Sequence, residues 1–445
     1  MGKTTKNKEE TATFLFKNIQ QEKQKLIHEK IIMDKKDKHI YPIINIPFII
    51  PDTWLWCYLS DLSIIQEGPG LRKHQYTNHG VQFLTVTNIL ENSVNLNKSQ
   101  KYISLEEYNN KYTHFTINKG DIVTACSGAS WGKSAIYNLN DNIILNTSTL
   151  RLRFFNDLGN NKYLYYLTKT SYFKQNLNSH STGQQPNYGY SHYSKIPIPL
   201  PPLQEQEKIV TLLDEAFLAI EKAKTNAELN LQNAKELFES YLQDVFENHG
   251  EGWEEKTLEE ICKITSKLID PKEEQYQNLI HVGAGNIESE KGTLIKLQTA
   301  KEENLISGKF LFDSEMVLYS KIRPYLMKVV KCDFKGLCSA DIYPLVPAKE
   351  HIIQDFLYHL LLSKNFTEYA IEGSQRAGMP KVNRKHLFEY TFNCPPLQEQ
   401  KTIVKKLNTL QAQTKKLESI YTQKLSDLEE LKKSILQKAF NGELL

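Results

Sequence analysis

The sequence lacks most of the signatures that mark metal-binding, secreted or membrane proteins. Among 445 residues there are only six cysteines, no two of them spaced as CxxC and none followed by a histidine pair at zinc spacing. We therefore expect reduced thiols, mostly in the core. The most apolar stretch, 41–51, is too short and too rich in proline to cross a bilayer. No apolar segment follows the N-terminal lysines, so we expect no signal peptide and a cytoplasmic chain.

Charge of one sign is also scarce. The net charge is +3, with 40% hydrophobic and 24% charged residues, which is ordinary for a globular protein. Such a small net charge does not by itself indicate a nucleic-acid partner. It does not exclude one either, because DNA binding needs only a local basic face.

Recognisable catalytic motifs are absent as well. The segment 127–134 ends in Gly-Lys-Ser, but Ser127 occupies the place of the first glycine of a phosphate-binding loop, and 135–137 reads as a strand instead of a helix. The segment 393–396 resembles the Asn-Pro-Pro-aromatic loop of adenine methyltransferases, yet the order differs and Leu397 replaces the aromatic residue. The twelve histidines form no HExxH motif. These observations argue against a self-sufficient methyltransferase or nuclease.

The sequence does contain a long internal repeat. Residues 201–206 and 395–400 both read PPLQEQ, an offset of 194, and apolar residues such as Leu213 and Leu407 match without a gap afterwards. Weaker matches lie upstream, for example Trp54 with Trp253. The chain is therefore predicted to be two copies of one unit, each a variable globular part followed by a constant helical part.

The constant parts are predicted to be long helices, because the proline pairs suit a helix start and apolar residues then recur at spacings of four and three. The predicted coiled-coil seam comprises Ile209, Leu213, Ala216, Ile220, Ala223, Ala227, Ala234, Leu237 and Tyr241, and in the second copy Ile403, Leu407, Leu410, Leu417, Tyr421, Leu428, Leu431 and Ile435. Asn230 and Lys424 are predicted to occupy the same seam position.

Charge indicates which helices pair. Residues 204–246 contain four Lys and nine Asp or Glu, a net charge of −5, whereas 398–440 contain nine Lys and five Asp or Glu, a net charge of +4. Opposite charges favour pairing of the two helices with each other. A helix of about forty residues would span roughly 60 Å.

The variable parts are predicted to be mixed α/β (α+β). Short β-rich runs at 81–86, 121–125, 143–155 and 316–319 alternate with turn-forming residues. The predicted organisation is an N-terminal helical extension at 1–45, a first globular domain at 46–200, a first spacer helix at 201–248, a second globular domain at 249–394 and a second spacer helix at 395–445.

Polar, basic and aromatic loops occur at equivalent places in the two copies. Arg, Lys, Asn and Gln are the side chains that pair with base edges, and Lys and Ser suit phosphates, so these clusters are predicted to contact DNA. The predicted contact residues of the first domain are Ser127, Ser130, Trp131, Lys133, Ser134, Gln184, Gln185, Asn187 and Tyr188. Those of the second are Lys321, Arg323, Tyr325, Lys328, Arg376, Lys381, Asn383, Arg384 and Lys385.

Two PPLQEQ junctions that each close a variable domain and open a long helix resemble the specificity subunit of Type I restriction-modification enzymes. The segments 127–136 and 319–329 also resemble the recognition-domain loops of that family. The resemblance extends from about Trp54 to the C-terminus. Before it, Phe14, Phe16, Ile19, Leu26 and Ile27 suggest a helix that packs onto the long helices.

The resemblance implies a non-catalytic subunit with two target-recognition domains on two antiparallel coiled-coil helices, related by a pseudo-twofold axis. Each domain would read one half of a split double-stranded DNA site, and the helices would set the gap. Two modification subunits would methylate adenine with S-adenosylmethionine, and restriction subunits would use ATP and magnesium to translocate and cut. None of these cofactors is expected on this chain. The alternatives are a related Type II-like methyltransferase–nuclease complex and a coiled-coil scaffold without DNA readout.

Overall fold

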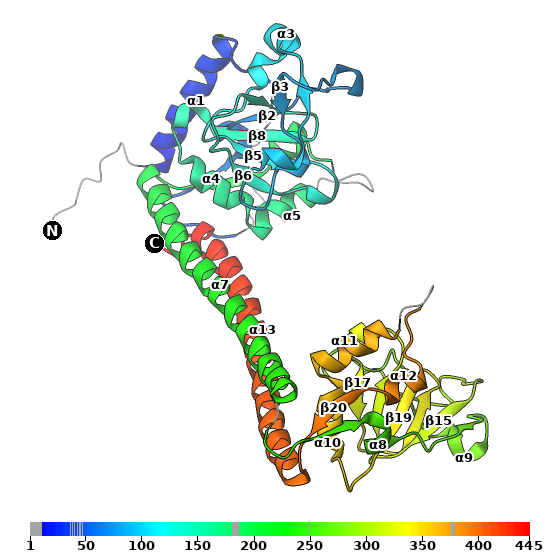
Figure 1. Ribbon diagram of the computed structural model, residues 1–445. Helices are drawn as coiled ribbons and strands as arrows, with labels where there is room; N and C mark the ends of the chain where they lie inside the picture. The colour runs from blue at the N-terminus through cyan, green and yellow to red at the C-terminus, as the bar shows by residue number, and fades with distance from the viewer. Residues whose placement is uncertain are drawn as a thin grey trace, which may run out of the picture. The chain divides into compact units, whose positions relative to one another are not determined.

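The computed structural model describes residues 11–35, 37, 39, 41, 43, 46, 48–179, 187–248, 250–374 and 379–445. The chain divides into two compact units, which are residues 1–225 with 425–445, and residues 226–424. Each unit contains one mixed α/β globular domain, called recognition domain 1 or 2 after the expectation stated above, together with a stretch of both long helices (Figure 1). The predicted fold class is therefore confirmed.

Three small sheets build recognition domain 1. Its first strand, β1 (Leu55–Tyr58), pairs antiparallel with its last, β9 (Pro197–Leu200), and so closes the domain. The main sheet has the order β2-β8-β5-β6 and comprises Ser63–Glu67, Thr149–Phe154, Ile122–Ala125 and Ser134–Ile136. A second sheet has the order β4-β3-β7 and comprises Tyr102–Ile103, Val81–Phe83 and Ile143–Ile144.

Short helices cover the main sheet of this domain (Figure 1). They are α2 (Leu59–Leu62), α4 (Asn161–Thr168), α5 (Ser171–Ser179) and α6 (Tyr190–Tyr193), while α3 (Leu105–Glu107) lies next to the second sheet's strands in sequence. Leu152 of β8, Leu164 of α4 and Phe173 of α5 belong to one buried apolar cluster. The alternation of apolar and polar residues along β8 places one face of the strand in this core.

Recognition domain 2 repeats this order. Strand β10 (Glu254–Thr257) pairs with β20 (Thr391–Cys394), and the main sheet β11-β19-β16-β17 comprises Cys262–Lys263, Ile342–Pro347, Val317–Ser320 and Val329–Lys331. The other sheet, β12-β15-β18-β13-β14, comprises Leu268–Ile269, Lys309–Phe312, Gly336–Ser339, Ile280–Val282 and Gln298–Thr299. The helices are α8 (Leu258–Ile261), α9 (Glu274–Gln277), α10 (Gln354–Leu361), α11 (Lys364–Glu372) and α12 (Arg384–Phe388). The parallel pair β13–β18 matches β3–β7, so the predicted duplication holds for the topology.

The predicted strand at 143–155 is two strands. Asn146 and Thr149 form a turn between them, in which the Asn146 amide donates to Thr149 Oγ1 (2.9 Å) and the Thr149 amide donates to the Asn146 carbonyl (2.9 Å). Strand β7 then joins β3 in one sheet, and β8 joins β2 and β5 in the other. The run is uniformly β-prone, so only the turn-forming Asn-Thr-Ser within it signals the break.

The N-terminal helix α1 (Ala12–His28) is present as predicted, and its Ile19 and Leu26 belong to the buried cluster that also contains Leu213 of α7 and Phe440 of α13. The helix lies against α2 and the 3-10 turn 155–157 of recognition domain 1. Lys23 Nζ pairs with Asp61 Oδ1 at 3.1 Å, and Gln20 Nε2 donates to the Asp61 carbonyl at 2.6 Å. The helix therefore packs on the first unit through its apolar face, and the polar contacts with Asp61, which its apolar pattern does not reveal, add to that packing.

The long helices α7 (Leu203–Glu247) and α13 (Leu397–Phe440) pack antiparallel within each unit. In the first unit Lys224 pairs with Glu429 at 3.1 Å, and Lys432 lies over the Phe217 ring at 5.3 Å. In the second unit the Thr414 hydroxyl donates to the Ala234 carbonyl at 3.2 Å, and Lys406 lies over the Tyr241 ring at 4.1 Å. Residue numbers rise along one helix as they fall along the other, which confirms the predicted antiparallel pairing.

The seam prediction is half right. Alternate positions, such as Leu213, Ile220 and Ala227, are buried as expected. At the seam positions between them, the residue that faces the partner helix is the one after the predicted residue. The predicted residues Asn230, Leu237, Leu417, Lys424 and Leu431 are therefore exposed. The buried or half-buried seam positions of α7, spaced alternately by four and three residues, are Leu213, Phe217, Ile220, Lys224, Ala227, Leu231, Ala234, Phe238, Tyr241 and Val245. Those of α13 are Leu407, Gln411, Thr414, Glu418, Tyr421, Leu425, Leu428, Lys432, Ile435 and Ala439.

The cause of the shift is that apolar residues stand on both sides of the true seam. Ala216 precedes Phe217 and Leu237 precedes Phe238, so a single helix offers two stripes of similar quality. The partner helix selects the stripe with the larger rings in α7. It also brings Lys432 to Phe217, where a cation–π contact compensates for a charged seam residue.

The second glutamine of each PPLQEQ junction ties the long helix to its recognition domain. The fully buried Gln206 accepts from the Asn160 amide (2.9 Å) at the start of α4 and donates to the Pro201 carbonyl (2.9 Å). Gln400 likewise accepts from the Ile353 amide (3.0 Å) at the start of α10 and donates to the Pro395 carbonyl (2.8 Å). One side-chain amide thus satisfies buried backbone groups on two elements.

We predict that Gln400→Ala lowers the free energy of unfolding by about 1–3 kcal/mol, because the Ile353 amide and the Pro395 carbonyl lose a buried partner. Urea-induced unfolding of the full chain measures the change. Gln398→Ala is the matched control, since Gln398 is exposed in the same turn and should change stability little. Equal effects of the two substitutions would contradict this role for Gln400.

His359 of α10 is fully buried against both long helices of its unit. Its Nε2 lies 2.9 Å from Asn408 Oδ1 of α13, and its ring centroid lies 6.4 Å from that of Phe238 of α7. Burial lowers the pKa of His359 to about 4, with the Lys331 charge acting in the same direction. The imidazole is therefore neutral in the folded protein at neutral pH.

A histidine whose folded pKa is depressed stabilises the fold above its unfolded pKa of about 6.5, and that contribution is lost as the pH falls towards 4. We predict that acidification over this range destabilises the second unit by up to about 3 kcal/mol. His359→Gln should flatten the pH dependence of the urea midpoint, whereas substitution of the exposed His79 by Gln should not. An unchanged pH profile in His359→Gln would show that another group titrates.

Candidate nucleic-acid interface

In recognition domain 1, the two predicted contact segments meet. The loop that follows β5 includes Gly128, whose φ of +66° suits glycine, and a 3-10 turn over 128–130. The Tyr188 amide donates to the Cys126 carbonyl at 2.9 Å, and Ser127 forms a β-bridge with Asn187. Backbone pairing therefore fixes the loop after β5 beside the segment that precedes α6.

Recognition domain 2 joins its two segments in the same way. The Val382 amide donates to the Lys321 carbonyl at 2.8 Å, Ile322 forms a β-bridge with Lys381, and the Arg323 amide donates to the Pro380 carbonyl at 2.9 Å. The loop after β16 thus lies beside the segment that leads into α12. Contact with DNA stays a prediction, but the grouping of these residues is a property of the structure.

The most accessible predicted residues are in domain 2. Arg323, Tyr325, Asn383, Arg384 and Lys385 are exposed. Arg323 has a left-handed backbone (φ +50°, ψ +62°), a sparsely populated conformation, just before the 3-10 turn Pro324–Leu326, in which Pro324 is buried and Tyr325 exposed. Lys385 pairs only loosely with Glu389 (3.7 Å), while the Asn383 side chain caps α12 by accepting from the His386 amide (2.9 Å).

Several predicted residues have packing roles. Ser134 is fully buried, with its hydroxyl 2.8 Å from that of Thr168. Tyr188 is buried and donates to Asn178 Oδ1 at 2.6 Å, and the half-buried Trp131 packs on its ring with centroids 5.1 Å apart. As contact residues Ser134 and Tyr188 were wrong, because their side chains belong to the core that supports the loop.

Other predicted residues are half-buried, exposed or outside the described part of the chain. The half-buried Lys328 amine donates a hydrogen bond to the Ala284 carbonyl at 2.5 Å, so one of its donors is already used inside the domain. Ser127, Ser130 and Lys133 are half-buried on the loop of domain 1, and Asn187 is exposed beside them. Gln184, Gln185 and Arg376 lie outside the described residues.

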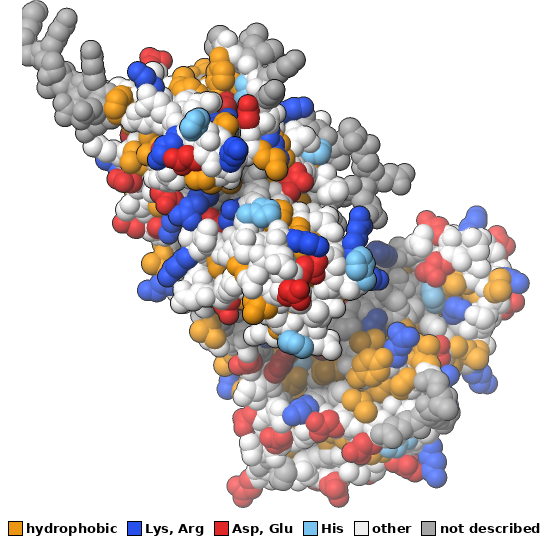
Figure 2. Space-filling model, turned by 90° about the horizontal axis from the view of Figure 1, so that it is seen from above, with side chains coloured by type: hydrophobic (Ala, Val, Ile, Leu, Met, Phe, Trp, Pro, Cys, Tyr) orange, Lys and Arg blue, Asp and Glu red, His pale blue; other side chains and the backbone are white. Residues whose placement is uncertain are grey.

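Asp341, which was missed by the sequence analysis, lies inside the basic cluster of domain 2. Its Oδ1 is 3.2 Å from Lys381 Nζ and 3.7 Å from Lys321 Nζ. Burial and the neighbouring Lys381 lower the pKa of Lys321. Asp341 comes twenty residues after Lys321, and no local motif connects the two. On the face shown in Figure 2, Lys and Arg side chains likewise lie among Asp and Glu and do not form one continuous basic surface.

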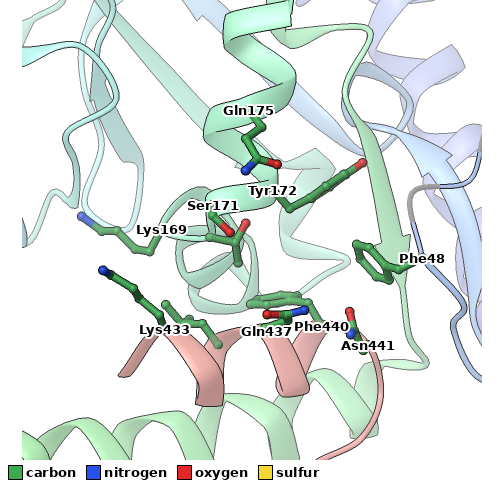
Figure 3. A pocket seen from close by; sticks show the side chains of 11 residues that line it. Phe48, Lys169, Ser171, Tyr172, Gln175, Lys433, Gln437, Phe440 and Asn441 are labelled. Atoms are coloured by element: carbon green, nitrogen blue, oxygen red, sulfur yellow. The ribbon is translucent and has the colours of Figure 1, made fainter. Parts of the chain in front are cut away.

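Each unit also has a hollow where its recognition domain meets a long helix. In the first unit α5 and the end of α13 enclose about 390 Å³; Phe48, Tyr172 and Phe440 contribute aromatic rings, and Lys169 and Lys433 lie together at one side (Figure 3). Burial lowers the pKa of Lys169 to about 8.

The corresponding hollow of the second unit encloses about 290 Å³ between α11 and the end of α7. Its Leu242 and Gln243 match Leu436 and Gln437 by the sequence repeat, whereas Glu239 stands where the first unit has Lys433. The two hollows therefore share an apolar part and differ in charge.

The described ranges contain neither a cluster of metal-ligating side chains nor a helix suited to crossing a membrane. No group of three or more His, Cys, Asp or Glu side chains in that part of the chain is arranged to hold a metal ion. No described helix combines the length and the apolar character that a membrane crossing needs.

Comparison with solved structures supports the fold. A chain from a structural study of complex assembly and conformational transition in the type I R-M system has a TM-score of 0.71 at 18% identity, covering 89% of this chain and all (100%) of that chain. The crystal structure of the HsdS subunit from Thermoanaerobacter tengcongensis has a TM-score of 0.60 at 19% identity, covering 89% of this chain and 99% of that chain.

Sequence comparison extends the likeness. The specificity subunit of the Type I restriction enzyme EcoDI from Escherichia coli is 38% identical over 192 residues, which are 43% of this chain and 42% of that subunit. The EcoAI specificity subunit from the same organism is 26% identical over 305 residues, covering 65% of this chain and 47% of that subunit. The matches thus span less than half the length of these two relatives. A family model described as "Type I restriction modification DNA specificity domain" matches residues 51–231 and again 250–427, most of the chain, and the chain therefore belongs to this family.

Proposed function

We propose that this chain is the DNA sequence-recognition subunit of a Type I restriction-modification complex, in which each recognition domain reads one half of a bipartite double-stranded DNA site. The observation that carries the proposal is the repeated pairing of two loop segments by the same backbone hydrogen bond, from Tyr188 to Cys126 and from Val382 to Lys321. The two domains thus share this backbone arrangement but carry different side chains on it, and reading two different half-sites requires different side chains.

The two backbone arrangements differ in the chemistry around them. Around the first, Ser127, Asn187 and Trp131 are neutral; around the second, Lys381, Arg384 and Lys385 are basic. Distinct donors and acceptors select distinct bases in the major groove, so the target is expected to be asymmetric. The basic cluster also suits phosphate contacts, which position a protein on the duplex without reading its sequence.

We further propose that α7 and α13 set the unspecified gap between the two half-sites. Helix α7 has 45 residues, and at 1.5 Å per residue such a helix is about 67 Å long. Successive major grooves lie about 34–36 Å apart along one face of DNA. A helix of this length is therefore sufficient to serve as the spacer.

The proposed partners are two modification subunits, which would methylate adenine with S-adenosylmethionine, and restriction subunits, which would translocate and cleave DNA with ATP and magnesium. This chain would be non-catalytic, cytoplasmic and free of these cofactors. Two equivalent docking places are supported by the repeat itself, because each unit presents a hollow at the same place between its recognition domain and a long helix, although the two hollows differ in charge.

Exchange of a recognition domain tests the proposal. Residues 251–394 are replaced by the second domain of another family member, the complex is assembled with its modification subunits, and methylated sites are mapped by sequencing. We expect one half-site to change while the other half-site and the gap stay the same, because the two domains read DNA separately. A change in both half-sites, or in neither, would be evidence against separate readout.

Arg384→Ala tests a single contact in domain 2, since Arg384 is exposed at the start of α12 within the basic cluster. A lost base contact should cost about 1–3 kcal/mol and relax specificity at one position of the second half-site, whereas a lost phosphate contact should weaken all sequences alike. Binding to duplexes with single base changes distinguishes the two. Lys349→Ala is the control. Lys349 forms an exposed ion pair with Glu315 outside the basic cluster, so its loss should not change binding to the second half-site. Unchanged affinity in Arg384→Ala would exclude this residue from the interface.

A further inference from the structure

Three chain segments meet at one residue in each recognition domain. In domain 1, the Cys126 amide donates to the Ser148 carbonyl (2.9 Å), while the Cys126 carbonyl accepts from Tyr188 (2.9 Å). In domain 2, the Lys321 amide donates to the Asp341 carbonyl (3.0 Å), while the Lys321 carbonyl accepts from Val382 (2.8 Å). We call this arrangement the three-segment clamp. Its backbone is the same in both domains.

The side chains on the clamp differ between the domains. In domain 1 the clamp and its bridged neighbour carry Cys126, Ser148 and Asn187, all neutral. In domain 2 the matching positions carry Lys321, Asp341 and Lys381. The two copies of the repeat therefore share the backbone of the clamp but differ in its side chains, which are neutral in domain 1 and charged in domain 2. These side chains are candidates for what distinguishes the two half-sites.

The ionic set is organised around Asp341. Its carboxylate faces Lys381 at 3.2 Å and Lys321 at 3.7 Å, and the Lys321 amine also donates to the Ala340 carbonyl. The Lys321 side chain is only 13% exposed, whereas those of Asp341 and Lys381 are 43% and 44% exposed. Lys381 is therefore the amine that can reach a ligand, and Asp341 restrains it from the protein side.

The ring of Tyr343 completes the cluster. Lys321 Nζ lies 5.1 Å from the ring centroid, and the Tyr343 hydroxyl donates to the Val382 carbonyl at 3.2 Å. The positive charge of Arg384 also acts on Tyr343. The charged groups of this cluster are thus the basic Lys321, Lys381 and Arg384 and the acidic Asp341.

Resting on the proposed function, we propose that Asp341 is a positioning residue for the second half-site. A lysine amine on its flexible stem pairs with any phosphate it can reach, so it favours DNA without reading sequence. A carboxylate between two amines restrains them and repels the phosphate backbone, which reserves Lys381 for a base edge. Asp341 thus lowers non-specific affinity and raises discrimination at the same point.

The variant Asp341→Asn tests this role because it removes the charge and keeps the shape. The assembled complex is incubated with a library of random-sequence duplexes, and bound sequences are read to define each half-site. Binding to a motif-free duplex is then measured over a salt series. We expect discrimination at one or more positions of the second half-site to fall about tenfold. Motif-free binding should become tighter and more salt-dependent, as for an added phosphate contact, and the first half-site should be unchanged.

Two further variants make the test specific. Glu315→Gln makes the same charge change at the other end of β16, where Glu315 pairs with Lys349, and should alter neither readout. Asp341→Glu restores the carboxylate and should restore discrimination. A general increase in positive charge would instead make Glu315→Gln behave like Asp341→Asn, which would overturn the proposal.

Other outcomes also decide the question. If Asp341→Asn retains the discrimination of the native chain, or loses it together with motif-free binding, Asp341 does not position a base contact. If the native complex enriches no two-part motif at all, the proposed function itself fails. Enrichment of a two-part motif that Asp341→Asn leaves unaltered would refute only the role of Asp341.

Discussion

The constraint on which the rest of this structure depends is that each compact unit is completed by both long helices. In the first unit, Leu213 near the start of α7 and Phe440 at the end of α13 share one apolar core with Tyr163 of the recognition domain, whose ring centroid lies 5.1 Å from that of Phe440. Burying a side chain of this size stabilises a fold by about 1.5–3 kcal/mol. Because the core of each unit includes residues from both long helices, we infer that folding of the recognition domains and pairing of the helices are coupled.

That arrangement separates what must stay constant from what is free to change. Gln206 and Gln400 join each helix start to its domain through buried backbone groups, so their surroundings tolerate little substitution. The loops after β5 and β16 are held by backbone hydrogen bonds, which require no particular side chain. The frame therefore survives when its side chains are exchanged, and a new DNA preference can arise without loss of the fold.

The sequence predicted the features that repeat or have a clear period. The duplicated junctions and the two long helices follow from spacing, and the pairing of the helices with each other follows from charge, whereas their antiparallel direction was implied only by the family resemblance. Features set by tertiary contact were missed. Choosing Phe217 over Ala216 in the seam depends on the partner helix, the polar contacts of α1 depend on Asp61, and the position of Asp341 depends on the register of β19 against β16. Ser134 and Tyr188 were misjudged because a polar side chain in a loop gives no sign of whether its hydroxyl finds a partner inside the core.

The small net charge of the chain also has a physical explanation. The windows 204–246 and 398–440 carry −5 and +4, so the spacer helices nearly cancel each other and contribute little to the total of +3. The field that matters for DNA is then local, within reach of a Debye length of about 8 Å at physiological salt. In domain 2 that field comes from Lys321, Lys381 and Arg384, moderated by one carboxylate, whereas the matching clamp of domain 1 is neutral. Under the proposed function, two domains with one backbone arrangement would therefore meet DNA by different balances of charge and hydrogen bonding, a difference that the almost neutral composition does not reveal.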